Sequence, residues 1–386
     1  MSKDPSAILP APYLHRNWRA FLNRTHAKES REWPVYSDAL FTGDLRDLGP
    51  YSVLNTISIP IYGRARPILV VRGGICADEH GDGNTRAVYH GDHHSNELVA
   101  LLSLCFGVRL RAGAQSRMFT HGGDPLGTPT SFGDPIEYVL PQGPLRIPIL
   151  ARGPTNPVHL RDDVSSRRLR TLPQLDPGSA GCLIKSARLY QNALWVAEDD
   201  PSMAWMYLVS SIETAAGQWQ RRRRSDVQNL KDSMPDLVRV LAACGGEAHV
   251  SAVAAKLAHL TGSTRKFLDF IDAFNPGPLA EPRMRQLAVD WSRLRELVAI
   301  VYKWRSQALH AGTPFPAPMC WAPLVVGRCR IDFPNEVDGA VAEVPIGFAS
   351  GTGDAMWDHK DIPMQLHVFE HITRGALQLW WDSLVG

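Results

Sequence analysis

The sequence predicts an α+β protein, with a mixed, β-rich N-terminal domain over residues 1–180 and an all-α helical domain over residues 181–386. Two patterns predict this class. Alternating and short apolar runs, which are typical of strands, occur between residues 51 and 113. From residue 181, apolar residues instead recur every three or four positions, the spacing of one face of a helix. A chain of 386 residues is long enough for two domains with separate cores.

The composition is that of a soluble globular protein, with 44% hydrophobic and 21% charged residues. Because the net charge is only +2, any nucleic-acid-binding surface must be local. The N-terminus lacks the apolar core of a signal peptide, and no apolar run approaches the roughly 20 residues of a membrane span. Six scattered cysteines without a C-x-x-C pair predict free thiols in a reducing cytoplasm and argue against zinc ribbons. They are Cys76, Cys105, Cys182, Cys244, Cys320 and Cys329.

The expected elements of the N-terminal domain are short and are separated by glycine and proline. Strands are predicted where apolar residues alternate or form a brief run, and a buried helix where the run is longer and lacks breakers. The predicted elements are a helix at 17–25, strands at 52–59 and 67–71, a buried helix at 97–106 and a strand at 108–113.

Residues 76–95 are rich in histidine and acidic side chains, which are good metal ligands. Their spacing, however, fits no common metal site. The alternative, which we adopt, is a loop that leads into a helix, with Asp92 and Ser95 as capping residues. We therefore expect no metal or other cofactor. The side chains concerned are His80, His90, His93, His94, Asp78, Glu79, Asp82 and Asp92.

Residues 120–180 carry repeated Gly, Pro, Asp and Ser and should be loop-like. Their basic segment 167–170 suits either contact with nucleic acid or a solvated face. A second basic run lies at the end of the helix expected from Pro201 to about Trp219. It suits the negative end of the helix dipole and would equally bind RNA phosphates. This run is Arg221, Arg222, Arg223 and Arg224.

The helical domain contains a well-marked helix start, with Asp200 placed as N-cap and Pro201 at the first helical position. Glu213 lies at the edge of the apolar stripe of this helix. Residues 313–360 should form a loop and strand insertion. Further helices are predicted at 187–197, 235–244, 248–260, 265–274 and 363–384, the last packing back on the bundle.

The segment 304–312 ends another helix, whose apolar stripe leads into a charged position. The stripe is Leu287, Trp291, Leu294, Val298 and Val301. Its next member is Arg305, and a buried arginine requires a carboxylate, a phosphate or a partner chain. His310 follows five residues later, before Gly312 ends the helix. Histidine can transfer a proton near neutral pH and arginine can bind a phosphate with two hydrogen bonds, although such a pair also arises by chance.

The Arg305–His310 segment resembles the R-x(4–6)-H signature of the HEPN superfamily, small helical domains that include many prokaryotic ribonucleases. The neighbouring residues 301–305 and 309–312 are similar to its Apea-like branch. The helix at 97–106 and the basic strand after it also resemble the N-terminal region of Apea-like proteins. The resemblance covers the C-terminal half well and implies a HEPN-like helical bundle there.

The resemblance further implies a metal-independent endoribonuclease whose partner is RNA. His310 would then transfer a proton and Arg305 would stabilise charge on the phosphate. Glu213 resembles the acidic residue of many HEPN domains, where it would hold Arg305 or orient His310; an ordinary boundary glutamate is the alternative. HEPN ribonucleases typically dimerise, so a homodimer through the helical domain is expected, with a trigger or partner protein at the N-terminal domain.

Two other functions fit the same residues. The chain could be a catalytically silent HEPN-type module that senses a trigger and only dimerises. It could also be a nucleotide-binding antitoxin or sensor that holds a nucleotide phosphate in the same pocket. The sequence contains no nucleotidyltransferase or Walker-type motif, so nucleotide chemistry would require a partner.

Overall fold

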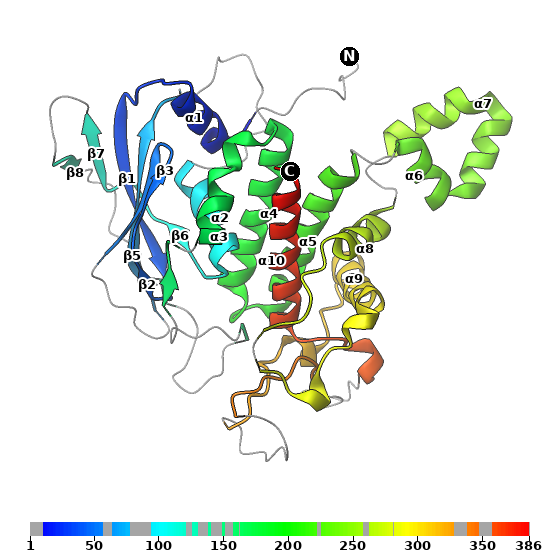
Figure 1. Cartoon of the computed structure of the whole chain (residues 1–386). Coiled ribbons are helices and arrows are strands. Elements are labelled where there is room, and N and C mark those ends of the chain that lie inside the picture. The colour runs from blue at the N-terminus through cyan, green and yellow to red at the C-terminus, as the bar shows by residue number, and fades with distance from the viewer. Residues whose placement is uncertain are drawn as a thin grey trace.

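The computed structural model confirms the predicted α+β class, with an antiparallel sheet at one end of the molecule and a bundle of helices beside it (Figure 1). It describes residues 11–56, 64–77, 94–120, 126–129, 138–139, 149–150, 157–161, 163–221, 225–257, 262–280, 282–327, 338–346 and 357–385. Its α-helices are α1 (Tyr13–Leu22), α2 (His94–Phe106), α3 (Asp163–Arg170), α4 (Pro177–Val196), α5 (Pro201–Arg221), α6 (Asp226–Ser233), α7 (Pro235–Leu257), α8 (Ser263–Ala273), α9 (Leu294–Ala311) and α10 (Leu366–Ser383).

The sheet is built around two long antiparallel strands, β1 (Glu29–Ser37) and β5 (Arg64–Ile75), with Trp33 opposite Val71. The strand order is β3-β4-β5-β1-β7-β8. A separate parallel pair joins β2 to β10. The remaining strands are β2 (Phe41–Thr42), β3 (Leu45–Leu48), β4 (Tyr51–Asn55), β6 (Arg111–Ala112), β7 (Arg117–Thr120), β8 (Thr128–Pro129), β9 (Tyr138–Val139) and β10 (Val158–His159).

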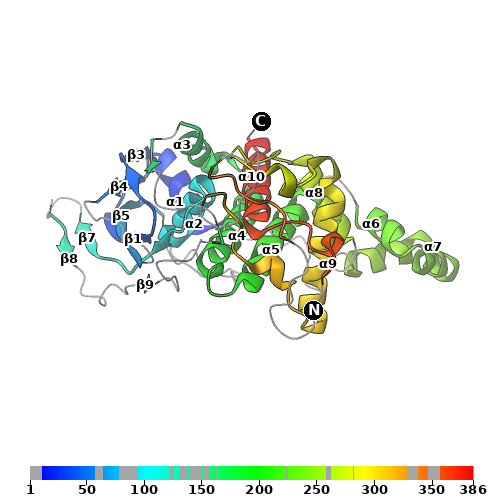
Figure 2. The ribbon, with the colours of Figure 1, turned by 90° about the horizontal axis from the view of Figure 1, so that it is seen from below.

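Helix α2 is the layer between the sheet and the bundle (Figures 1 and 2). Nearly all of its residues are buried, because it is apolar around its whole circumference and packs on both sides. Gln378 of α10 donates hydrogen bonds to the Leu104 and Cys105 carbonyls near the end of α2. One apolar core runs from the sheet through α2 into the helices. The division into domains at residue 181 stays a prediction, and α4 already begins at Pro177.

The helical half has α4, α5 and α10 at its centre (Figure 1). The start of α5 is as predicted, since the Asp200 carboxylate accepts a hydrogen bond from the Met203 amide at 2.9 Å. Helix α10 packs back on the bundle, and its Glu370 accepts a hydrogen bond of 2.5 Å from Tyr190 of α4. These contacts bring the C-terminal segment into the middle of the fold.

The prediction of one long helix through residue 287 was wrong, because α9 begins only at Leu294. Leu287 and Trp291 lie in two separate 3₁₀ turns, Arg285–Leu287 and Trp291–Arg293. The reason is a set of hydrogen bonds to the segment around Glu343. The buried Glu343 carboxylate accepts a hydrogen bond of 2.7 Å from the Val289 amide. The Leu287 carbonyl accepts hydrogen bonds from the Glu343 and Val344 amides. Of the strand character expected in 313–360, the described residues 313–327, 338–346 and 357–360 show isolated bridges at Val341.

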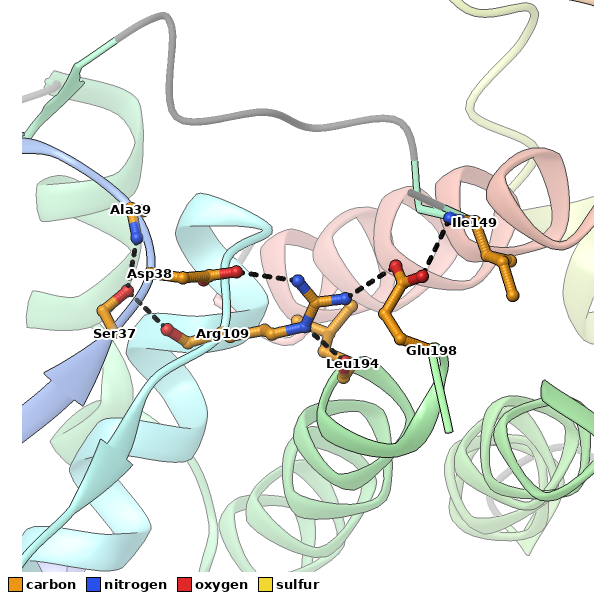
Figure 3. Close-up of polar contacts among 7 residues, drawn as sticks. All are labelled: Ser37, Asp38, Ala39, Arg109, Ile149, Leu194 and Glu198. Carbon is orange, nitrogen blue, oxygen red and sulfur yellow. Dashed lines mark hydrogen bonds and ion pairs between the residues drawn. The ribbon is translucent and has the colours of Figure 1, made fainter. Parts of the chain in front are cut away.

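The strand predicted over 108–113 is also shorter, with only Arg111–Ala112 in β6. Arg109 leaves the strand pattern because its guanidinium is buried between the sheet and the bundle (Figure 3). It donates to Asp38 at 2.8 Å, to Glu198 at 3.0 Å and to the Leu194 carbonyl at 2.6 Å. Burial opposes the charged form, but the two carboxylates outweigh it and raise the pKa of Arg109. The segments that contain Asp38, Arg109 and Glu198 are distant in sequence and thus meet at the Arg109 guanidinium.

Helices α6 and α7 project from the far end of the bundle (Figure 2). Within the part of the chain that the structure describes, α7 is the helix long and apolar enough for a membrane span, with a mean hydropathy of 1.3 and mostly exposed residues. The helix is broken at Gly246, which has φ 69° and ψ −168°, between the two helices predicted there. Neither half, 235–245 nor 247–257, has the roughly 20 residues that a span needs.

We predict that Arg109→Met lowers the free energy of unfolding by about 3–5 kcal/mol, because it leaves the Glu198 carboxylate buried without its partner. Arg239→Met is the matched control. Arg239 is paired with Asp236 on the surface, where ion pairs contribute about 0–1 kcal/mol. Urea denaturation measures both. Equal losses in the two variants would show that the Arg109 network contributes no more to the free energy of unfolding than a surface ion pair.

The first helix begins at Tyr13 rather than at residue 17, because the buried Glu97 carboxylate of α2 accepts the Leu14 amide at 2.7 Å. Burial raises the pKa of Glu97 from 4.5 to about 7, in spite of this bond and nearby arginines. The native state therefore binds the proton more tightly than the unfolded chain. The stability associated with this group is fully present below pH 4.5 and is lost as the pH rises through about 7.

We predict that wild-type protein loses roughly 3 kcal/mol of stability relative to Glu97→Gln between pH 4.5 and pH 8. Glutamine keeps a hydrogen-bond acceptor for Leu14 and cannot ionise. The measurement is urea denaturation of both proteins at several pH values. A difference that stays constant over this range would contradict a raised pKa at Glu97.

Candidate functional site

Helix α9 lies beside α5 and α8, on the side of the bundle away from the sheet (Figures 1 and 2). The predicted stripe of Leu294, Val298 and Val301 is buried. The helix ends at Gly312, whose φ of 67° is the left-handed conformation that glycine adopts easily, and whose amide donates to the Gln307 carbonyl. The bounds of this last part of the helix are as predicted.

Arg305 meets Glu213 of α5 at the edge of the buried interface. Its Nη2 donates a hydrogen bond of 2.7 Å to Glu213 Oε2, and the two side chains are only 17% and 21% exposed. One of the two roles expected for Glu213, holding the arginine, is therefore present. A charge-assisted bond between two rigid helices fixes the position of the guanidinium.

Tyr302 is the member of this cluster that sequence reasoning missed. Its hydroxyl donates a hydrogen bond of 2.8 Å to Glu213 Oε1, so both carboxylate oxygens are occupied. Burial, and then the charge of Glu213, raise the pKa of Tyr302 to about 12. The signal was its position three residues before Arg305, which puts the two side chains on one face of α9.

His310 does not lie with this cluster. It is exposed on the last turn of α9, and five residues turn a helix by about 140° beyond one full circle. Among the described residues, no hydrogen bond or ion pair joins His310 to Arg305, Glu213 or Tyr302. Within one chain the guanidinium is thus held in place, whereas the imidazole is free to meet solvent or another molecule.

The basic segment 167–170 is engaged elsewhere in the fold. Arg168 binds both carboxylate oxygens of Asp382, at 2.8 and 2.7 Å, and so joins α3 to α10. Arg170 pairs with Asp47 at 2.6 Å. Of the second basic run, Arg221 ends α5, and Arg222, Arg223 and Arg224 lie outside the described residues.

The histidine-rich stretch falls mostly outside the described residues, which resume at His94. That imidazole is buried among the rings of Tyr13, Trp33 and Tyr51. In the described ranges, no group of three or more His, Cys, Asp or Glu side chains is placed to hold a metal ion. The described cysteines are free thiols, namely Cys76, Cys105, Cys182, Cys244 and Cys320.

Comparison of the chain with protein-family models, curated proteins and solved structures finds no significant match. A guanidinium held by Glu213 and Tyr302 can bind an anion through its remaining donors, because Arg305 Nη1 makes no hydrogen bond within the described chain. The imidazole of His310 is exposed at the same helix end and is accessible to a second molecule.

We predict a coupling free energy of about 1–2 kcal/mol between Glu213→Gln and Arg305→Met in a double-mutant cycle, because each removes the same partly buried charge-assisted bond. The control cycle pairs Glu213→Gln with His310→Ala, which should couple by less than about 0.5 kcal/mol. Unfolding in urea supplies all the values. Coupling of similar size in both cycles would mean that His310 belongs to the cluster after all.

Proposed function

We propose that the protein is a metal-independent endoribonuclease of the HEPN type. The observation that carries the proposal is the positioned Arg305: it is held by Glu213 at 2.7 Å and lies one turn and a half before the exposed His310 on α9. Phosphodiester cleavage by an internal nucleophile needs proton transfer and stabilisation of charge on the phosphate, for which an imidazole and a fixed guanidinium are suited.

In the proposed reaction, the ribose 2′-oxygen loses its proton and forms a bond to the adjacent phosphorus. The bond from phosphorus to the 5′-oxygen breaks, and that oxygen gains a proton. The products are a 2′,3′-cyclic phosphate and a 5′-hydroxyl. His310 carries one of the two proton transfers, and Arg305 stabilises negative charge on the non-bridging oxygens. Glu213 and Tyr302 are positioning residues that keep Arg305 in the required orientation.

We further propose that the active enzyme is a homodimer through the helical half. Arg305 and His310 point in different directions on α9, so a second copy is needed to bring an imidazole and a guanidinium to the same phosphate. RNA is the substrate, and the arginine run 221–224 at the end of α5 is a contact for its phosphates. The proposal also includes a cytoplasmic location and a trigger protein at the N-terminal domain. The proposed role is growth arrest in antiphage defence or a toxin system.

One observation favours the catalytically silent alternative. The charge of Arg305 is already neutralised by a carboxylate of the same chain, as in a structural ion pair. In that case the helical half would only bind a ligand or dimerise, and substitution of His310 would not change the rate of RNA cleavage.

We predict that His310→Ala lowers the rate of RNA cleavage by about 10²–10⁴, the usual contribution of a general acid or base, without lowering the melting temperature, because His310 is exposed. Arg305→Lys should fail nearly as badly as Arg305→Ala, since an ammonium does not reproduce the planar fork of donors. Glu213→Gln should show an intermediate loss. The assay measures cleavage of total RNA in the presence of EDTA and sequences the new ends.

The control is Lys303→Ala, which removes another exposed cationic side chain of the same helix. It should cut RNA at the wild-type rate. A well-folded His310→Ala protein that matches wild type would overturn the enzyme proposal and support the silent module. Activity that is lost in EDTA and restored by one divalent ion would overturn the metal-independent mechanism.

A further inference from the structure

A second cationic site lies at the sheet end of the molecule, far along the fold from α9. It is a cavity of about 290 Å³ lined by residues of β3 and α3 among others. These two elements pack against each other and lie side by side in Figure 2. Three arginines line it, Arg46, Arg161 and Arg170, together with Asp44 and Asp47. Nothing in the proposed ribonuclease reaction uses these residues.

The fold brings the three arginines together from separate parts of the chain. Arg46 belongs to β3, and Arg170 ends α3. Arg161 follows β10, which pairs in parallel with β2, and the Leu160 amide bonds to the Thr42 carbonyl. This short pairing places residues 157–161 beside the start of β3, although the two segments are more than a hundred residues apart in sequence.

Arg161 has both terminal nitrogens of its guanidinium available for a ligand. Its Nε donates to the Asp44 main-chain carbonyl at 3.2 Å, which anchors the side chain at the cavity. Its two terminal nitrogens make no hydrogen bond or ion pair within the described part of the chain. A guanidinium fixed at one edge and open at the other matches two oxygens of a phosphoryl group.

The other two arginines are each paired with a carboxylate, and that of Asp47 is exposed and can be exchanged. Arg170 pairs with Asp47 at 2.6 Å, and the Asp47 side chain is 73% exposed. Arg46 pairs with Asp44 at 2.8 Å, with 72% of the arginine side chain exposed. Exposed ion pairs contribute little to stability, so an incoming dianion can displace Asp47 from Arg170 at small cost. Asp44 is retained, because it also accepts the Asn55 amide at 2.8 Å.

We propose that this cavity binds a small phosphorylated ligand through its phosphoryl group. The guanidiniums of Arg161 and Arg170 hold the phosphoryl oxygens, and Arg46 adds positive charge at the rim. A volume of about 290 Å³ exceeds what a single phosphate fills and is near the lower limit of small-molecule sites, which favours a phosphate attached to a further group. The limited volume favours a small molecule over a polynucleotide, which tracks an extended groove.

The test is calorimetric titration of the full-length protein with inorganic pyrophosphate at low ionic strength. Wild type should bind one pyrophosphate per chain. Arg161→Gln and Arg170→Gln should each weaken binding at least about tenfold, since each removes charged donors to the ligand. Arg239→Gln, which removes a similarly exposed, paired arginine on α7, should bind as wild type does. Melting temperatures of all the variants should agree.

Three results would overturn the proposal. The first is the absence of saturable binding to wild type. The second is an Arg161→Gln protein whose affinity equals that of wild type. The third is a short single-stranded RNA that competes for the site and binds more tightly than pyrophosphate at the same salt concentration, which would make the surface an RNA contact. His310→Ala should leave pyrophosphate binding unchanged, so failure here and failure of the ribonuclease proposal are separate outcomes.

Discussion

The burial of Arg109 is the interaction on which the arrangement of the two halves depends. The guanidinium cannot be left unpaired in the interior, so Asp38 at the end of β1, Glu198 after α4 and the Leu194 carbonyl must all reach it (Figure 3). The requirement is directional, unlike the apolar contacts around it. The docking of the sheet beside α4 therefore has to keep these three bonds, and α2 lies between the sheet and α4.

Three buried or partly buried carboxyl groups also join elements of the fold. Glu97 of α2 holds the first turn of α1, and Glu343 holds the segment that would otherwise extend α9. Glu213 holds Arg305 and Tyr302 between α5 and α9. In each case a carboxylate from one element accepts hydrogen bonds from backbone or side-chain donors of another. Apolar packing supplies most of the stability, and these charges decide which elements are neighbours.

The two cationic sites differ in how their arginines are held, and this difference suits different ligands. Arg305 is restrained by a carboxylate and a tyrosine in a partly buried interface, which suits a guanidinium that must keep one orientation while bonds change. Arg46, Arg161 and Arg170 surround a half-open cavity, and Asp47, the partner of Arg170, is exposed. Such groups can rearrange around a ligand as it enters. The ribonuclease proposal and the phosphorylated-ligand proposal therefore rest on separate features of the fold.

The sequence by itself determined the class of the fold and most helices, because these depend on local periodicity and capping. The α5 start at Asp200 and the end of α9 at Gly312 follow from side-chain and backbone preferences within a few residues. It also singled out Arg305 as a charge that needs a partner. Only the tertiary structure decided that this partner is Glu213, helped by Tyr302, and that His310 lies apart. The same holds for the short β6 and the late start of α9, which depend on Arg109 and Glu343 meeting groups far away in the chain. Those pairings depend on three-dimensional packing between distant residues, which produces no periodic pattern in the sequence.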